Sequence, residues 1–206
     1  MRNDILNEQQ RTYNEVFSKK SGNAPQCHQN DFHYDWWMFP TKLAAADRDK
    51  VSDRTRQYAV TEQDIQDLLS HPLFIKTYMK SIAKYLSNLE KYGWNNYPIR
   101  FAKLLCSIAE FIAVAKNSQD PAVKAIELQL ELLACELYIY GTENIQTDLP
   151  HFAKGMAAVA KVLELEKASA ELIVHQYKEK APIAEGKKEK QGKNAKKPSG
   201  KPNKKF

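Results

Sequence analysis

The chain has 206 residues, of which 43% are apolar and 27% are charged, values that are ordinary for a globular protein and exclude disorder along the whole length. The length suits one domain of average size with an appendage, so two full domains are not expected. The net charge is +6, but residues 181–206 alone carry +7, which leaves the first 180 residues close to neutral. Any attraction to polyanions is therefore expected to come from the C-terminal end.

The cysteines and the apolar stretches of the sequence indicate in which cellular compartment the protein is expected. Three cysteines occur, and they are too few and too scattered for a disulfide framework: Cys27, Cys106 and Cys135. A reducing compartment fits best, so we predict a cytoplasmic location. Asp4 and Glu8 interrupt the N-terminal segment where a secretory signal needs an apolar core. The most apolar stretches, 104–115 and 128–140, contain glutamates and fall short of the roughly 20 residues of a membrane span, so no transmembrane segment is expected.

The N-terminal third of the chain contains two expected helices. Apolar residues recur at helical spacing from residue 3 to about 20. A short helix is expected to run through Phe39, with Asn30 or Asp31 as its cap. Residues 40–60 are rich in Asp, Arg and Ser and are interpreted as a long connection.

Two helix starts follow this connection. Thr61, with Asp64 three residues later, resembles a capping box. Ser70 is expected to cap a second helix that begins at Pro72 and stops at Gly93. Apolar residues form one stripe along that helix: Phe74, Tyr78, Ile82, Tyr85, Leu86 and Leu89.

The strongest amphipathic pattern comes after Pro98. Its apolar stripe consists of Phe101, Leu104, Leu105, Ile108, Phe111, Ile112 and Ala115. A second row of small residues flanks this stripe: Ala102, Cys106, Ala109 and Ala113. Because small side chains allow two helix axes to approach closely, we expect another helix to pack against this row.

Two further helices complete the expected fold. Asp120 is expected to cap a helix that continues to Gly141 and pairs with the preceding helix as an antiparallel hairpin. Thr147 or Asp148 is expected to cap the last helix, which should reach about residue 180.

The resulting fold class is all-α. No segment alternates apolar and polar residues in the way a strand requires, so strand content should be near zero. We predict a compact, bundle-like domain of about six or seven helices over residues 1–180. A disordered lysine-rich tail should follow at 181–206, because it has too few apolar residues to offset the entropy of ordering.

The densest chemistry lies in the decapeptide 31–40, which contains two carboxylates, an imidazole and two tryptophans. On a continuous helix Asp31 and Asp35 share one face, while His33 points about 200° away from both, so these three side chains cannot chelate one metal ion. We therefore predict no metal site, and the absence of HExxH, GxSxG and GxGxxG patterns predicts no cofactor. An enzyme that uses Asp31, His33 and Asp35 at a cleft remains the alternative hypothesis.

The aromatic residues of the decapeptide point to packing or recognition. On a helix Phe32, Trp36 and Phe39 share one face, which Trp37 and Met38 widen. This pattern is typical of a short helix buried in a core or covering a groove. We predict that Trp36, Trp37 and Phe39 contact a protein partner of unknown identity.

The tail supplies the candidate polyanion contacts. Its lysines are Lys187, Lys188, Lys190, Lys193, Lys196, Lys197, Lys201, Lys204 and Lys205. This spacing can follow the phosphates of nucleic acid, or an anionic membrane surface, without reading sequence. The tail has no arginine, and its one aromatic residue is Phe206, so base stacking among the lysines is not expected. A solubilising end is the alternative interpretation.

Several short tracts recur in the order of a known helical family. They are HYDWWMFP at 33–40, TEQDI at 61–65, YGW at 92–94, and RFAKLL at 100–105 with Ser107. Together they make residues 31–112, about two fifths of the chain, resemble the conserved helical region named after the opioid growth factor receptor. The resemblance implies an all-helical fold and no established catalytic residue. The leading hypothesis is therefore a helical interaction module with a basic tail.

Overall fold

The computed structural model describes residues 1–18, 20–21, 24–25, 34–93 and 98–165. In chain order the elements are α1 (Asn3–Thr12), the π-helical η1 (Tyr13–Phe17), β1 (Lys20–Ser21), β2 (Ala24–Pro25), α2 (Asp35–Met38), the 3-10 helix η3 (Ala45–Lys50), α3 (Asp53–Tyr58), α4 (Glu62–Leu69), α5 (Pro72–Tyr92), α6 (Pro98–Asn117), α7 (Pro121–Asn144) and α8 (Pro150–Val162). The predicted all-α class is confirmed, with eight α-helices in the described ranges where six or seven were expected. The strands β1 and β2 form one short antiparallel pair. The predicted tail at 181–206 lies outside the described residues.

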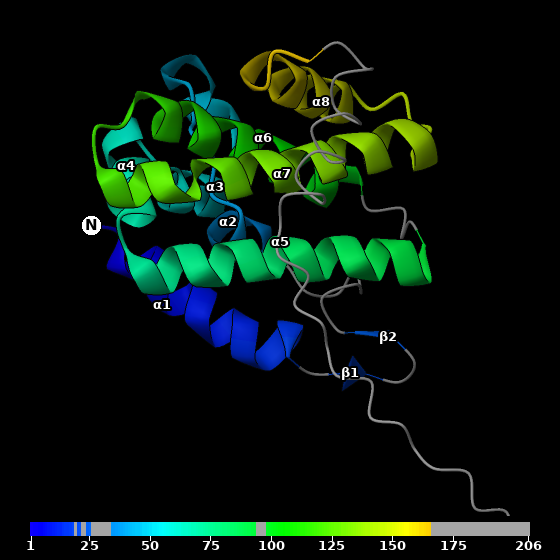
Figure 1. Cartoon of the computed structure of the whole chain (residues 1–206), viewed down its shortest axis with the longest axis horizontal. Coiled ribbons are helices and arrows are strands. Elements are labelled where there is room, and N and C mark those ends of the chain that lie inside the picture. The colour runs from blue at the N-terminus through cyan, green and yellow to red at the C-terminus, as the bar shows by residue number, and fades with distance from the viewer. Residues whose placement is uncertain (19, 22–23, 26–33, 94–97, 166–206) are drawn as a thin grey trace, which may run out of the picture.

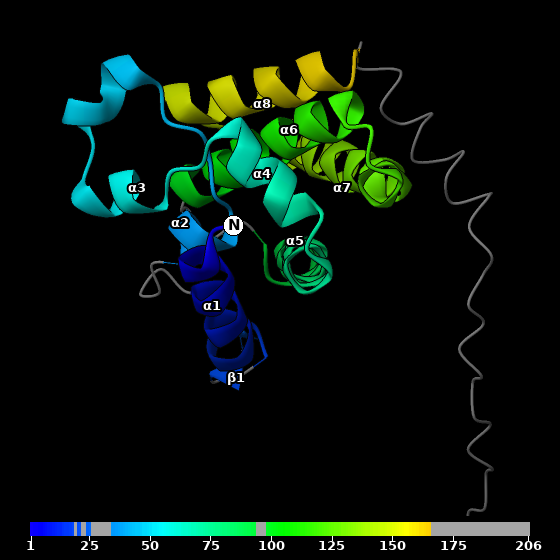
Figure 2. The ribbon, with the colours of Figure 1, turned by 90° about the vertical axis from the view of Figure 1, so that its left-hand side faces the viewer.

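Helix α6 lies at the centre of the helical body. It packs against α2, α4, α7 and α8. Figures 1 and 2 show α8, α6 and α5 stacked in that order down the view. The predicted apolar stripe of α6 is buried along its whole length: Phe101, Leu104, Leu105, Ile108, Phe111, Ile112 and Ala115. Rings of α5 complete this core, since Phe74 and Tyr78 both stack on Phe111, with centroids 5.8 and 4.8 Å away.

The row of small residues on α6 receives α8, as predicted. Gly155 of α8 comes so close that an added Cβ would lie 2.9 Å from Cβ of Leu105 and 3.0 Å from the backbone oxygen of Ala102. Figure 2 shows α8 running along α6. The helix contact therefore depends on the absence of a side chain at Gly155.

The two glycines expected to stop helices behave differently. Gly93 ends α5 with φ of +77°, a left-handed conformation that favours glycine, and its N–H donates to the oxygen of Leu89. Gly141 does not end α7, which continues to Asn144, so that prediction is wrong. A Cβ at Gly141 would lie 2.9 Å from Sδ of Met156 and 3.3 Å from Cε1 of Phe101. This glycine therefore lies inside α7 and makes room for the side chains of Met156 on α8 and Phe101 on α6.

Two of the predicted caps are confirmed. The Thr61 hydroxyl accepts the Asp64 N–H at 3.1 Å, and the Asp64 carboxylate accepts the Thr61 N–H at 2.9 Å, which completes the capping box. At the start of α7 the Asp120 carboxylate accepts the Ala122 N–H at 2.8 Å. These caps were predictable because their partners lie within three residues in the sequence.

Two other caps differ from prediction. His71, not Ser70, caps α5, with Nδ1 accepting the Phe74 N–H at 3.4 Å. Ser70 ends α4 instead and donates to the oxygen of Gln66 at 3.0 Å. Helix α8 begins after Leu149 without a side-chain cap, so neither Thr147 nor Asp148 caps it.

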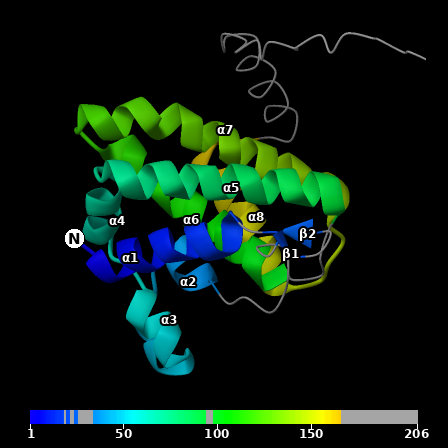
Figure 3. The same cartoon turned by 90° about the horizontal axis from the view of Figure 1, so that it is seen from below.

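The segment 40–60, predicted to be a long connection, carries two short helices of its own. It contains η3 and α3, and Ser52 caps α3 by accepting the Thr55 N–H at 3.2 Å. The Val60 N–H donates to the oxygen of Thr41 at 3.1 Å and closes the base of the segment. Figures 2 and 3 show residues 43–58, hereafter the arm, projecting from the helical body.

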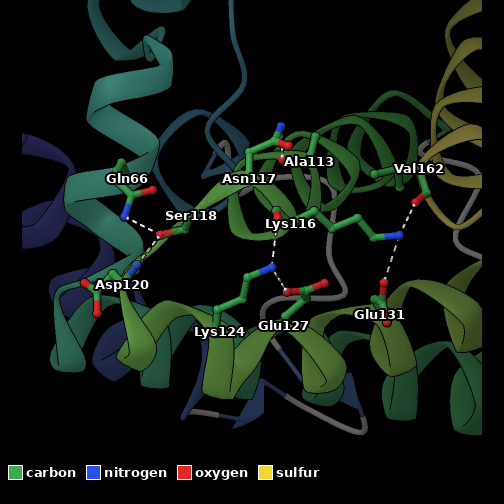
Figure 4. Close-up of polar contacts among 10 residues, drawn as sticks. All are labelled: Gln66, Ala113, Lys116, Asn117, Ser118, Asp120, Lys124, Glu127, Glu131 and Val162. Atoms are coloured by element: carbon green, nitrogen blue, oxygen red, sulfur yellow. Dashed lines mark hydrogen bonds and ion pairs between the residues drawn. The ribbon is translucent and has the colours of Figure 1, made fainter.

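Helix α8 ends earlier than predicted. Instead of reaching about residue 180, it stops at Val162, and Glu164 takes a left-handed φ of +54°. Lys116 of α6 holds this end, since its Nζ donates to the Val162 oxygen at 2.9 Å and lies 3.1 Å from the Glu131 carboxylate (Figure 4). A lysine at a C-terminal helix carbonyl stabilises the end of the helix. This bond joins residues 46 positions apart, so no local pattern reveals it.

Candidate functional site

Two charged side chains pair inside the core where α2 meets α6. Nε of Arg100 lies 2.6 Å from Oδ1 of Asp35, and the two side chains are 0% and 3% exposed. Cζ of Arg100 also lies 4.4 Å from the centroid of the Tyr34 ring. A buried ion pair of this kind is held by its geometry and is costly to separate. Asp35 therefore has a structural role, while Asp31 and His33 of the alternative catalytic set lie outside the described residues.

The aromatic residues of the decapeptide separate into buried and surface positions. Phe39 is fully buried among the rings of α5, and Trp37 is 8% exposed, with its Nε1 donating to the Thr12 hydroxyl at 2.7 Å. Trp36 is half-buried, and its Nε1 donates to the Thr55 hydroxyl of the arm at 3.0 Å. Helix α2 is only four residues long, so the single face expected for a continuous helix does not form. Of the three predicted partner contacts, Trp36 keeps exposed surface.

Cations from two other elements cover the Trp36 ring. Nζ of Lys103 on α6 lies 4.7 Å from the ring centroid, and Cζ of Arg54 on the arm lies 5.5 Å from it. Both distances fall within the range of cation–π attraction. Trp36 thus joins α2, the arm and α6 at one surface position.

A cleft of about 260 Å³ opens beside Lys103, between α6, α8 and the segment that precedes the arm. Its walls combine apolar and charged side chains from these three elements: Thr41, Lys42, Ile99, Ala102, Lys103, Cys106, Glu110, His151 and Lys154. The Glu110 carboxylate accepts the backbone N–H of Lys42 at 2.7 Å, which fixes one edge of the cleft.

Burial changes the proton affinities in this cleft. It lowers the pKa of Lys103 to about 8, although the charge of Asp35 acts in the opposite direction. Burial also raises the pKa of Glu110, against the hydrogen bond from Lys42, and raises the pKa of the Cys106 thiol. Cys106 is therefore a protonated thiol at neutral pH and not an activated nucleophile. The groups present favour binding of an anion over covalent catalysis.

A second hollow, of about 460 Å³, lies between the C-terminal parts of α5 and α7. It carries acidic groups on both sides, from Glu90, Glu136 and Glu143, and the Tyr140 hydroxyl at its wall donates to the Leu89 oxygen at 3.2 Å. No group of three or more metal-ligating side chains gathers anywhere in the described ranges. The described residues that line this hollow therefore offer acidic surface, and they include no basic side chain and no metal-binding group.

Sequence reasoning missed the residues of the cleft, although a signal was present. Ile99, Ala102, Lys103, Cys106 and Glu110 follow helical spacing and share one face of α6. Lys103 and Glu110 lie on the same face as the small residues of α6. Helix packing alone does not require charged side chains at these positions. The partners contributed by α8 and by Lys42 carry no such local signal.

Comparison of the chain with family models, with curated proteins and with solved structures gave no match. The resemblance of residues 31–112 to the opioid growth factor receptor region stays a prediction. Across the described ranges, every helix is either too short or too polar to cross a lipid bilayer. The geometry around Trp36 and Lys103 is therefore the main indication of function.

Proposed function

We propose that this protein is a cytoplasmic helical interaction module whose partner-binding surface centres on Trp36. The observation that supports this most is the position of Trp36, half-buried where α2, the arm and α6 meet, with Lys103 and Arg54 over its ring. Tryptophan and arginine are enriched among the residues that contribute most to protein–protein binding. Trp37 and Phe39 serve this surface indirectly, by anchoring α2 in the core.

The burial of Asp35 favours the module over the enzyme alternative. A general acid or base must reach a proton of its substrate, usually within hydrogen-bond distance or through one water. Asp35 is enclosed and already paired with Arg100 at 2.6 Å. Free thiols at Cys106 and Cys135 agree with a reducing, cytoplasmic compartment.

Quantitative affinity purification of the native protein tests the proposed surface. Trp36→Leu should remove stoichiometric partners that copurify with the wild-type chain, because it deletes the exposed ring. The matched control is Leu128→Ala, which changes an exposed apolar residue of α7 and should leave those partners in place. Circular dichroism of both variants establishes that the helical fold is retained. The same partners recovered with Trp36→Leu would refute this surface.

The lysine-rich tail adds a second proposed activity, nonspecific contact with nucleic acid. Its support is the charge distribution, since residues 181–206 carry +7 and the rest of the chain is nearly neutral. If about five phosphates are engaged, binding to a duplex should weaken with salt at a log–log slope of roughly −4.5. Truncation after Lys180 should abolish this binding on unrelated duplexes alike. Equal affinity of the truncated and full chains would leave the tail as a solubilising end.

A further inference from the structure

Within the part of the chain that the structure describes, Arg100 of α6 pairs with Asp35, whereas Lys103 three residues later forms no ion pair. Among the described residues, no hydrogen bond or ion pair reaches its Nζ, which lies 4.7 Å from the centroid of the Trp36 ring. Its side chain is half-buried and lines the cleft. An ammonium withdrawn from water without a carboxylate carries a desolvation cost that an anion in the cleft would offset.

The rest of the cleft supplies what such an anion would need. Ile99, Ala102 and Cys106 form an apolar wall along α6, and Lys42 and Lys154 add positive charge from the two neighbouring elements. Ile99 is 50% exposed, so apolar surface is open to a ligand at the mouth of the cleft. The cleft therefore combines an apolar wall with positive charge on several sides.

We propose that this cleft is a binding site for a small organic monocarboxylate, with its apolar body against Ile99, Ala102 and Cys106 and its carboxylate at Lys103. The site goes beyond the proposed partner surface and shares with it the side chain of Lys103. Lys42 and Lys154 attract the ligand and Lys103 binds its charged group.

Size and charge select this ligand class. A volume of about 260 Å³ lies just below the range of roughly 300–1,000 Å³ that is common for drug-sized ligands, so the ligand is small. The Glu110 carboxylate lies in the same cleft and would repel a second negative charge, which disfavours phosphate dianions. The cleft has lysines and no arginine, so it offers point charges without the bidentate fork that recognises phosphate well.

Calorimetric titration of the full chain with octanoate tests the site. Octanol serves as the neutral ligand of equal chain length, and inorganic phosphate reports attraction of any anion to the tail lysines. Octanoate should bind the wild-type chain more tightly than either. Lys103→Met should weaken octanoate binding by about tenfold or more, because it removes the charge and keeps the apolar stem. Lys76→Met, at an exposed lysine of α5 away from the cleft, should leave it unchanged.

Two further variants test separately the positive charge at Lys103 and the apolar mouth of the cleft. Lys103→Arg retains the positive charge and should keep octanoate affinity within about threefold. Ile99→Asp places a carboxylate at the mouth of the cleft, at a position exposed enough to spare the fold, and should abolish octanoate binding. No binding of octanoate to the wild-type chain, equal binding of octanoate to the wild-type chain and to Lys103→Met, or binding of octanol as tight as that of octanoate would each overturn the proposal.

Discussion

Arg100 and Lys103 lie three residues apart on α6, and they differ in burial and in whether a carboxylate pairs with them. Arg100 is completely enclosed, with Asp35 at 2.6 Å and the Tyr34 ring against its guanidinium. Lys103 is half-buried beside a cleft and has no carboxylate partner in the described part of the chain. A charge that serves the fold is enclosed together with its counterion, since a buried unpaired charge would be costly. A charged side chain that lines a cleft without a counterion is a candidate ligand-binding residue.

The largest effect is expected when the enclosed pair is broken. Asp35→Asn should lower the free energy of unfolding by about 3–5 kcal/mol, because Arg100 would remain buried without its counterion. Urea denaturation measures this change. The double variant Asp35→Leu/Arg100→Met should recover much of the loss, since it removes both charges. A loss below about 1 kcal/mol in Asp35→Asn would show that the Arg100 charge is satisfied in another way.

The next effect concerns the wall of the cleft that α8 provides. Gly155→Ala should cost about 1–3 kcal/mol, because its Cβ would meet Leu105 and the backbone of Ala102 and push α8 away from α6. The cleft should widen at Lys154, and octanoate binding should weaken.

Gly141→Ala is the matched control for this displacement. Its Cβ would lie 2.9 Å from Sδ of the flexible Met156 side chain, which can move away, and at 3.3 Å Cε1 of Phe101 would have to shift by only a few tenths of an ångström. Alanine also gains about 0.5–1 kcal/mol over glycine within a helix. Thermal unfolding of the two variants should therefore show a clear loss for Gly155→Ala and little change for Gly141→Ala. Equal losses would mean that the close approach of α8 and α6 is not what limits this contact.

Substitution of Lys103 is expected to change the free energy of unfolding by a smaller amount and in the opposite direction. Lys103→Met should raise the free energy of unfolding at pH 7 by about 1 kcal/mol, because an unpaired ammonium no longer has to be withdrawn from water. Arg100→Met should instead lower it, since Asp35 would be left buried alone. Denaturation of the two variants side by side measures this difference. Destabilisation by both would place Lys103 among the structural charges.

The smallest effect is a pH dependence that belongs to Lys103. Its pKa in the fold is about 8, below the ordinary lysine value of 10.5, so the unfolded chain binds more protons between these two values. Stability should therefore rise with pH through this window, by about 0.5 kcal/mol per pH unit after allowance for solvent screening. Lys103→Met should lack this increment, whereas the contributions of Glu110 and Cys106 remain in both chains. Parallel stability curves for the two proteins from pH 8 to 10 would contradict the assignment.

Much of the helical framework was predictable because its signals are local. The capping box of Thr61 and Asp64, the Asp120 cap and the left-handed stop at Gly93 each involve residues within a few positions of one another. The apolar stripe of α6 was predicted from its spacing alone, and all of its residues are buried. These features follow from backbone hydrogen bonding and helical periodicity, which short stretches of sequence already determine.

The candidate sites were decided by tertiary structure. The ion pair of Asp35 and Arg100 joins positions 65 residues apart, and the cleft draws its walls from three separate elements. The local pattern also predicted, wrongly, that Gly141 ends its helix. The glycine there leaves room for the Met156 side chain of α8. Composition and periodicity determined that this chain is helical and where most helices begin. Which charges are enclosed and which face a cleft depended on how the helices pack, since a charge finds its counterion only when distant segments meet.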